Sequence, residues 1–314
     1  MRYGTPDRVP YFEEGLREGV IDVWRTQGLP KDADLSKIFS FDRREELEPD
    51  LDPRPDLQGW PTSRSELDLF RRNLDPNDPG RLPENWPERV RAWKDRDHVL
   101  TLWVHRGFFL SMGVRGWRRF TEVIFLLKDD PQFIREAMAI RGEFSARLAD
   151  NILRDVDIDA AVFVEPIGGN DRPLISPQMY EEFVLTNYEP VLEAVRQHGV
   201  DTIILLTFAN PRPLIPSILK WGFNCLWGSE VNMETMDYRD LRREFGRDLR
   251  LIGGIDLDAL RIGREAIRRE VEEKVPPLLA EGGYIPLADG RVREDMPFEN
   301  YVYYRKLLAK VTQE

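Results

Sequence analysis

The chain has a single cysteine, Cys225, among its 314 residues. It can therefore form no disulfide within itself and no metal site with several cysteine ligands. The longest apolar runs, near Ile203–Leu206 and Ile124–Leu127, are far too short to cross a bilayer. The first ten residues lack the apolar core of a secretory signal. These absences predict a cytoplasmic protein with no membrane partner.

Basic residues are fewer than acidic ones. The chain has 45 Lys and Arg and 56 Asp and Glu, which gives a net charge of −11. This balance argues against nucleic acid as a partner, since phosphate binding needs a basic surface. A small anionic ligand held by a few arginines is still compatible with it. The hydrophobic share of 41% is ordinary for a globular protein of this length, which can bury one large core.

Short apolar segments alternate along the chain with longer segments of helical periodicity. Most of the short segments are apolar throughout, as in parallel strands that are buried on both faces. We predict strands at Arg8–Phe12, His98–Val104, Ala160–Val164, Asp201–Leu206, Asn224–Trp227, Leu249–Gly253 and Gly283–Leu287, with a weaker eighth at Ser36–Phe41. Right-handed crossovers would join such strands into a closed barrel or an open doubly wound sheet.

The intervening helices have recognisable starts and stops. Asp130 and Ser176 each precede a proline, which predicts a helix N-cap followed by proline at the first helical position. The helix that begins after Ser176 should end near Gly199. Residues 43–87 are rich in proline and charge and are predicted to form a surface excursion that contains one helix, Glu66–Asn73.

Chemistry in parallel α/β folds gathers at the carboxyl ends of the strands. Five of the seven main predicted strands are followed there by carboxylates, which are Glu13 with Glu14, Glu165, Glu230, Asp256 and Asp289. The other two are followed by His105 with Arg106 and by Thr207 with Asn210. Crowded carboxylates need a metal, a cationic ligand, bound protons or nearby arginines.

Structural roles compete with functional ones at several of these positions. Asp256 can equally cap the following helix. Glu13 and Glu14 fit the solvated first turn of a helix slightly better than a site. A lone histidine such as His105 is more often structural than catalytic. Glu165 precedes a proline, which holds it extended and leaves no helix-cap role, so it is the strongest candidate.

Six stretches of the later half occur in an order and spacing that carry a family resemblance. They are Pro173–Tyr180, Pro213–Pro216, Leu251–Asp256, Val275–Leu279, Glu281–Pro286 and Phe298–Tyr301. From about Ala160 to the end the chain resembles the decarboxylase-like, mostly uncharacterised branch of the uroporphyrinogen decarboxylase superfamily, which also contains corrinoid-linked methyltransferases. Weaker similarity covers Arg8–Pro30 and Leu74–Pro87. The resemblance implies a single-domain α/β fold over residues 1–314, a (β/α)8 TIM barrel, and a homodimer.

The chain departs from this family at positions that matter for chemistry. Many relatives have His-Ser-Asp-Gly-Asn where this chain has Leu206–Asn210, and only Asn210 is kept. The histidine and cysteine ligands of the zinc-dependent methyltransferases are missing there, so no metal is expected. The arginine-rich segment that holds the carboxylates of porphyrinogens is replaced by Val9–Gly15, which makes uroporphyrinogen itself an unexpected substrate.

The leading hypothesis is a cofactor-independent carboxy-lyase that acts on a small carboxylated substrate. Glu165 would be the acid/base, and Asp289 and Glu230 would assist or orient. The predicted substrate-binding residues are Arg106, His105, Asn210, Asp256 and Arg291, and the two arginines would hold a carboxylate. Two alternatives stay open, a corrinoid-linked methyltransferase without zinc ligands that binds a corrinoid protein, and a non-catalytic ligand-binding barrel.

Overall fold

The computed structural model describes residues 3, 8–57 and 59–313. The chain has an α/β fold, as predicted, and divides into two compact units. Unit 1 comprises Met1–Arg44, Phe208–Asn210 and Cys225–Glu314, and unit 2 comprises Glu45–Thr207 and Pro211–Asn224. The described residues contain seven strands. The closed eight-stranded barrel and the single domain stay predictions.

Unit 2 contains most of the strands β1 to β4, which neighbour one another in that order; Arg44 of β1 and the last two residues of β4 belong to unit 1. Their bounds are Arg44–Leu47, Val99–His105, Ala160–Glu165 and Ile203–Ala209. Strand β3 pairs with β2 and β4, in parallel with both. The charged strand β1 was not predicted, because three residues of its sequence Arg-Glu-Glu-Leu are charged and the others were found by their apolar character.

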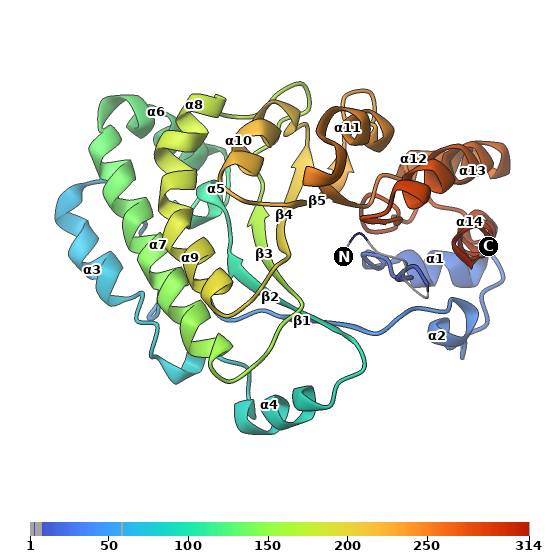
Figure 1. The fold of residues 1–314 in the computed structure, drawn as a ribbon, viewed down its shortest axis with the longest axis horizontal. Helices are drawn as coiled ribbons and strands as arrows, with labels where there is room; N and C mark the ends of the chain where they lie inside the picture. The colour runs from blue at the N-terminus through green and yellow to red at the C-terminus, as the bar shows by residue number, and fades with distance from the viewer. Residues whose placement is uncertain (1–2, 4–7, 58, 314) are drawn as a thin grey trace. The chain divides into compact units, whose positions relative to one another are not determined.

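The helices of unit 2 lie between these strands in the chain. They are α3 (Leu67–Arg72), α4 (Trp86–Lys94), α5 (Phe108–Ser111), α6 (Trp117–Asp129), α7 (Pro131–Leu153), α8 (Pro177–Tyr180), α9 (Thr186–Gln197) and α10 (Ile215–Lys220). Short 3₁₀ turns add η1 (Arg64–Glu66), η2 (Pro79–Arg81) and η4 (Arg212–Leu214), and η3 (Glu181–Leu185) is a π-helical turn. Helices α7 and α9 pack side by side (Figure 1). Helix α3 confirms the helix predicted at Glu66–Asn73.

Both predicted N-caps are confirmed. The Asp130 carboxylate accepts a hydrogen bond from Phe133 N at 3.0 Å, and the Ser176 hydroxyl accepts one from Met179 N at 3.2 Å. Each cap satisfies one of the free N–H groups in the first turn of its helix, and the proline after it loses no bond. Gly199 follows α9 with φ 76°, the left-handed conformation that glycine adopts most readily.

Unit 1 contains β5 (Cys225–Val231), β6 (Arg250–Ile252) and β7 (Tyr284–Ile285), which pair in parallel in that order. Its helices are α1 (Val20–Thr26), α2 (Leu35–Ile38), α11 (Tyr238–Phe245), α12 (Leu257–Ile262), α13 (Arg264–Glu281) and α14 (Phe298–Gln313), with the 3₁₀ turn η5 (Gly246–Asp248). Cys225 is buried, as expected of a core residue. Among the described residues of the chain, no helix is both long and apolar enough to cross a membrane.

Two of the predicted strands are wrong. Arg8–Phe12 is part of no strand, since Pro10 has no N–H and the backbone N–H and C=O of Tyr11 are bonded to the single residue Asp42. Ser36–Phe41 contains the end of α2 instead, because the Asp34 carboxylate accepts from Ser36 N and caps a helical turn. The other six predicted strands are confirmed, with ends that differ by a few residues.

Candidate functional site

Glu165 ends strand β3 in unit 2 and has no exposed surface. Its Oε1 accepts a hydrogen bond from Phe108 N at 2.9 Å. Its Oε2 accepts hydrogen bonds from the hydroxyls of Tyr188 and Tyr180, the latter at 3.4 Å. Burial raises the pKa of Glu165 to about 7, although all three hydrogen bonds oppose this rise. The strongest candidate of the sequence analysis, Glu165, is therefore a carboxyl whose pKa lies close to neutral pH.

Both tyrosines reach Glu165 because of the π-helical turn η3, which lies between them. In a regular α-helix, residues eight positions apart differ in direction by about 80°, since each residue turns the helix by about 100°. One additional residue absorbed in a π turn reduces this difference to about 20°. Tyr180 and Tyr188 can therefore face the same carboxyl from one helical segment, and neither was predicted from the sequence.

His105 ends strand β2 and is fully buried. The register between β2 and β3 shifts between Trp103 and His105, so that His105 rather than Val104 lies opposite Phe163. Such a bulge turns a side chain to the other face of a sheet. The His105 ring consequently stacks on the Phe163 ring, with 6.2 Å between centroids, and lies 4.5 Å from that of Tyr188.

The protonation state of His105 follows from its contacts. Its Nδ1 accepts a hydrogen bond from Gly107 N at 2.9 Å, so the ring proton lies on Nε2. Burial, with a smaller contribution from the cationic Arg141, holds the pKa of His105 well below its usual range. Nε2 has no hydrogen-bond partner among the described residues. His105 is thus a neutral donor, although its predicted role in substrate binding stays a prediction.

Gly107 allows the backbone to approach Glu165 closely. Its φ is +77°, and a Cβ atom here would lie 2.5 Å from Val164 O and 2.7 Å from Glu165 Oε1. No larger residue fits without displacing backbone. The glycine therefore places the N–H of Phe108 within hydrogen-bonding distance of the Glu165 carboxyl.

Arg106 follows β2, as predicted, and donates a hydrogen bond to the Asp52 carboxylate at 2.8 Å. Arg115 donates to the other Asp52 oxygen at 3.3 Å. The Arg106 guanidinium is thus already paired within unit 2. Its predicted role, to hold a substrate carboxylate, stays a prediction and would require a ligand to compete with Asp52.

Asp289 follows β7 in unit 1 and is 4% exposed. Its Oδ1 accepts from Leu257 N at 2.9 Å, and its Oδ2 accepts from Val231 N at 3.1 Å. Burial raises its pKa to about 8, and the nearby carboxylates of Asp256 and Glu14 contribute to this rise. Asp289 is therefore, after Glu165, the second carboxyl at a strand end whose pKa is raised to neutral pH or above.

Glu14 contributes a further acidic group near Asp289. Its two oxygens accept hydrogen bonds from Trp227 Nε1 and from the Ser229 hydroxyl, each at 3.0 Å. Burial raises its pKa, while these hydrogen bonds and the positive charge of Arg44 lower it. Trp227 and Ser229 belong to β5, so this contact fixes the N-terminal segment against that strand.

Glu230 differs from the buried carboxyls, because its side chain is 38% exposed and forms ion pairs with Arg17 and Arg293. Its backbone N–H donates to the carbonyl of Asp289 at 3.0 Å, which places it next to that residue. Arg17 and Arg293 each have a buried Nε with no hydrogen-bond partner among the described residues. These two arginines were missed by the sequence analysis, since no motif marks them.

The reading of Glu13 and Glu14 as the solvated first turn of a helix is wrong, because α1 begins only at Val20. Glu13 is buried and accepts hydrogen bonds from Arg305 Nη1 at 2.5 Å and from the Tyr304 hydroxyl at 2.7 Å. Burial raises the pKa of Glu13, and the charge of Arg305 counteracts this. Glu13 therefore anchors the N-terminal segment to α14.

The remaining predicted residues also lie in unit 1. The Asp256 carboxylate accepts from Asp258 N at 2.8 Å, so its capping role on α12 is confirmed. Asn210 is 4% exposed, and Arg291 is exposed. Their roles in substrate binding stay predictions. So does the expected convergence of Glu165 with Glu230 and Asp289, because Glu165 belongs to the other unit.

Within residues 3, 8–57 and 59–313, no group of three or more His, Cys, Asp or Glu is placed to hold a metal ion. In a comparison with known protein families, the model of the uroporphyrinogen decarboxylase (URO-D) family matches residues 110–301. The matched region includes β3, β4, β5, β6 and β7, and thus Glu165, Glu230 and Asp289. Among curated proteins, no sequence matches this chain.

Proposed function

Because the chain belongs to the uroporphyrinogen decarboxylase (URO-D) family, we propose that it is a carboxy-lyase for a small carboxylated substrate, with Asp289 as its proton donor. The observation that supports this most is the state of the Asp289 carboxyl. Burial raises its pKa to about 8, so the group is a neutral acid at physiological pH. Decarboxylation requires such a donor, because a carbanion develops as CO2 leaves.

In the proposed reaction, the bond between the substrate carbon and its carboxylate breaks, and the electron pair stays on that carbon. CO2 departs, and the proton of Asp289 moves to the carbon, which leaves Asp289 as a carboxylate. The N–H groups of Leu257 and Val231 would stabilise that carboxylate through the hydrogen bonds they already form. Solvent then returns a proton to Asp289 before the next turnover.

Asp289 and Glu165 differ in how accessible their carboxyl groups are to a substrate. Asp289 keeps 4% of its surface exposed, whereas Glu165 has none and its oxygens are bonded to three donors. A substrate could contact Glu165 only after a local opening of the structure. We therefore propose Asp289 as the donor, and we assign Glu165 the role of a buried carboxyl that orders β3, Tyr180 and Tyr188.

Arg17 and Arg293 are the proposed seat for a substrate carboxylate. Both pair with Glu230, whose backbone is bonded to Asp289, and this brings two guanidinium groups to the neighbourhood of the proton donor. Both arginine side chains are 39% exposed, although their Nε atoms are buried. A guanidinium can hold a carboxylate through a forked hydrogen bond from its accessible N–H groups. Glu230 would then orient the two arginines.

The test measures CO2 release from a panel of small aromatic and aliphatic carboxylic acids, followed by mass spectrometry of the products. With any acid that is turned over, Asp289→Asn should lower kcat by about 10² to 10⁴-fold, the usual contribution of a positioned acid. Asp258→Asn is the matched control, because Asp258 is an exposed acid on α12. Unchanged turnover by Asp289→Asn would remove Asp289 from the mechanism.

Two other outcomes would support the alternatives. A carboxylic acid that binds without releasing CO2 would favour the non-catalytic ligand-binding barrel. Methyl transfer to a corrinoid protein from a methylated amine or ether would favour the methyltransferase instead. The homodimer implied by the family remains a proposal, which sedimentation of the full chain can test.

A further inference from the structure

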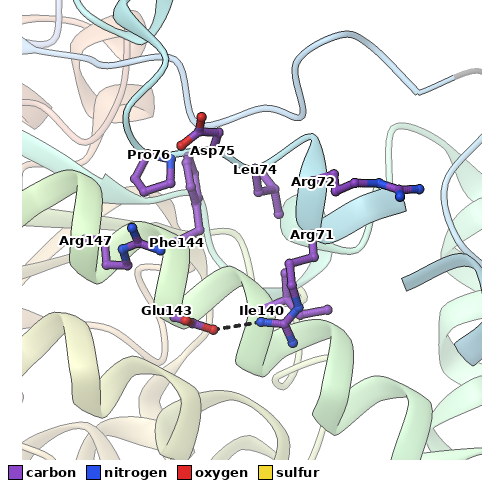
Figure 2. A pocket seen from close by; sticks show the side chains of 9 residues that line it. All are labelled: Arg71, Arg72, Leu74, Asp75, Pro76, Ile140, Glu143, Phe144 and Arg147. Atoms are coloured by element: carbon purple, nitrogen blue, oxygen red, sulfur yellow. Dashed lines mark hydrogen bonds and ion pairs between the residues drawn. The ribbon is translucent and has the colours of Figure 1, made fainter. Parts of the chain in front are cut away.

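Unit 2 contains a cavity of about 280 Å³ that involves none of the carboxyls discussed above (Figure 2). It is formed by α3, the segment that follows α3, and one face of α7. The lining residues are Arg71, Arg72, Leu74, Asp75, Pro76, Ile140, Glu143, Phe144 and Arg147. The apolar members are buried, whereas the three arginines are exposed. The cavity thus combines an apolar floor with an exposed rim of three arginines and two acids, Asp75 and Glu143.

Arg147 has no ion pair among the described residues, although an acid is available to it. Glu143 precedes it by four positions on α7, the spacing at which a helical glutamate and arginine pair favourably. Glu143 instead binds Arg71, with 2.9 Å between Oε2 and Nη1, as Figure 2 shows. The Arg147 guanidinium, beside Phe144, is therefore left to bind something else.

The pair between Arg71 and Glu143 offers little resistance to a competing anion. Both side chains are 57% exposed, and ion pairs this exposed contribute about 1 kcal/mol or less. A ligand carboxylate can therefore replace Glu143 at Arg71. Arg72 extends away from Arg71 in Figure 2 and is a residue of the outer rim.

Two buried arginines add positive charge behind the floor of the cavity. The Arg81 guanidinium lies 4.4 Å from the centroid of the Phe144 ring, and that of Arg141 lies 5.8 Å from it. Arg81 is 1% exposed and donates to the backbone carbonyls of residues 50, 52, 73 and 75, so no carboxylate is bonded to it directly. The carboxylates of Asp50, Asp78 and Asp75 act on Arg81 as well, so its positive charge is partly compensated, and the exposed Arg71 and Arg147 supply the main attraction for an anion.

We propose that this cavity binds a small organic anion, with its carboxylate between Arg71 and Arg147 and its apolar body on Phe144. The volume of about 280 Å³ is at the lower end for ligand pockets, so it suits a single aromatic ring and excludes a tetrapyrrole. The site is independent of the proposed carboxy-lyase activity, since Asp289, Arg17 and Arg293 belong to unit 1. Its ligand would be an effector rather than the substrate.

Calorimetric titration of the full chain with benzoate tests this site, with inorganic phosphate as a second probe. We expect saturable benzoate binding that Arg147→Gln weakens about tenfold or more, which corresponds to about 1.4 kcal/mol. Arg91→Gln is the matched control, because Arg91 is an exposed arginine that pairs with a helical glutamate, as Arg71 does. It should leave the affinity unchanged.

Three results would overturn the proposal. They are no benzoate binding up to millimolar concentration, binding that Arg147→Gln does not weaken, and phosphate binding as tight as that of benzoate, which would show that the apolar floor contributes nothing. Arg17→Gln separates this site from the proposed substrate seat. Benzoate binding should persist in that variant, and its loss there would place the ligand at the substrate seat instead.

Discussion

Replacement of Glu165 by glutamine isolates the energetic effect of a carboxyl that has no exposed surface. Burial raises the pKa of Glu165 from 4.5 to about 7. The folded chain therefore binds this proton more tightly than the unfolded chain does. The resulting stabilisation is complete below about pH 4.5 and is lost as the pH rises through about 7. Each tenfold change in proton affinity corresponds to about 1.4 kcal/mol, so the full change is about 3 kcal/mol, of which about 2 kcal/mol falls between about pH 5.5 and about pH 8.

Glutamine has the shape of the protonated acid and does not titrate. Its carbonyl can accept from Phe108 N, and its amide can donate to the hydroxyls of Tyr180 and Tyr188. We expect the free energy of unfolding of Glu165→Gln, relative to the native chain, to rise by about 2 kcal/mol from about pH 5.5 to about pH 8.

Urea unfolding followed by circular dichroism at both pH values measures this difference. Glu193→Gln, at an exposed position of α9, is the control and should show the same difference from the native chain at both. If the Glu165→Gln difference is also constant with pH, or falls, the Glu165 carboxyl is not protonated in the folded chain and the reasoning fails.

Three further predictions concern the same two units. Asp289→Asn should gain stability relative to the native chain as the pH rises through about 8, because burial raises the pKa of Asp289 and the native carboxyl then has to ionise; urea unfolding at pH values on either side measures this. Tyr188→Phe keeps the ring but removes a donor from Glu165, and should cost about 1–3 kcal/mol in the same assay. Gly107→Ala should lower the thermal midpoint far more than Gly199→Ala, since both glycines have nearly the same φ but only a Cβ at Gly107 would meet neighbouring atoms; equal losses would mean that backbone strain alone matters.

The sequence was most informative where burial alone determines the structure. Segments that are apolar throughout, such as Ala160–Val164 and Ile203–Leu206, are strands because a parallel strand is buried on both faces. Helix starts at Asp130 and Ser176 were predictable because capping depends on residues close in the chain. The charged strand Arg44–Leu47 was missed, since its pairing depends on a partner strand rather than on its own apolar character.

The site was predicted only in part, because its details depend on contacts between distant residues. The position of Glu165 before a proline correctly excluded a cap and pointed to a perturbed carboxyl. The bulge that turns His105 and the π turn between Tyr180 and Tyr188 have no comparable signal. Each results from one additional residue within a regular strand or helix. Its effect depends on which residues pack against that element, and the local sequence does not specify these.

Glu165, Glu230 and Asp289 show why a carboxylate at a strand end does not by itself identify a catalytic acid. All three lie at or beyond the carboxyl ends of parallel strands, yet Glu165 is enclosed by two tyrosines and a backbone N–H, and Glu230 is exposed and paired with two arginines. A proton donor must hold a proton at working pH and also touch the substrate. Glu165 has a raised pKa but no exposed surface with which to touch a substrate. Glu230 is exposed, but its carboxylate forms ion pairs with Arg17 and Arg293. Asp289 combines a pKa of about 8 with a small exposed area, and this combination is the reason to assign it the proton transfer.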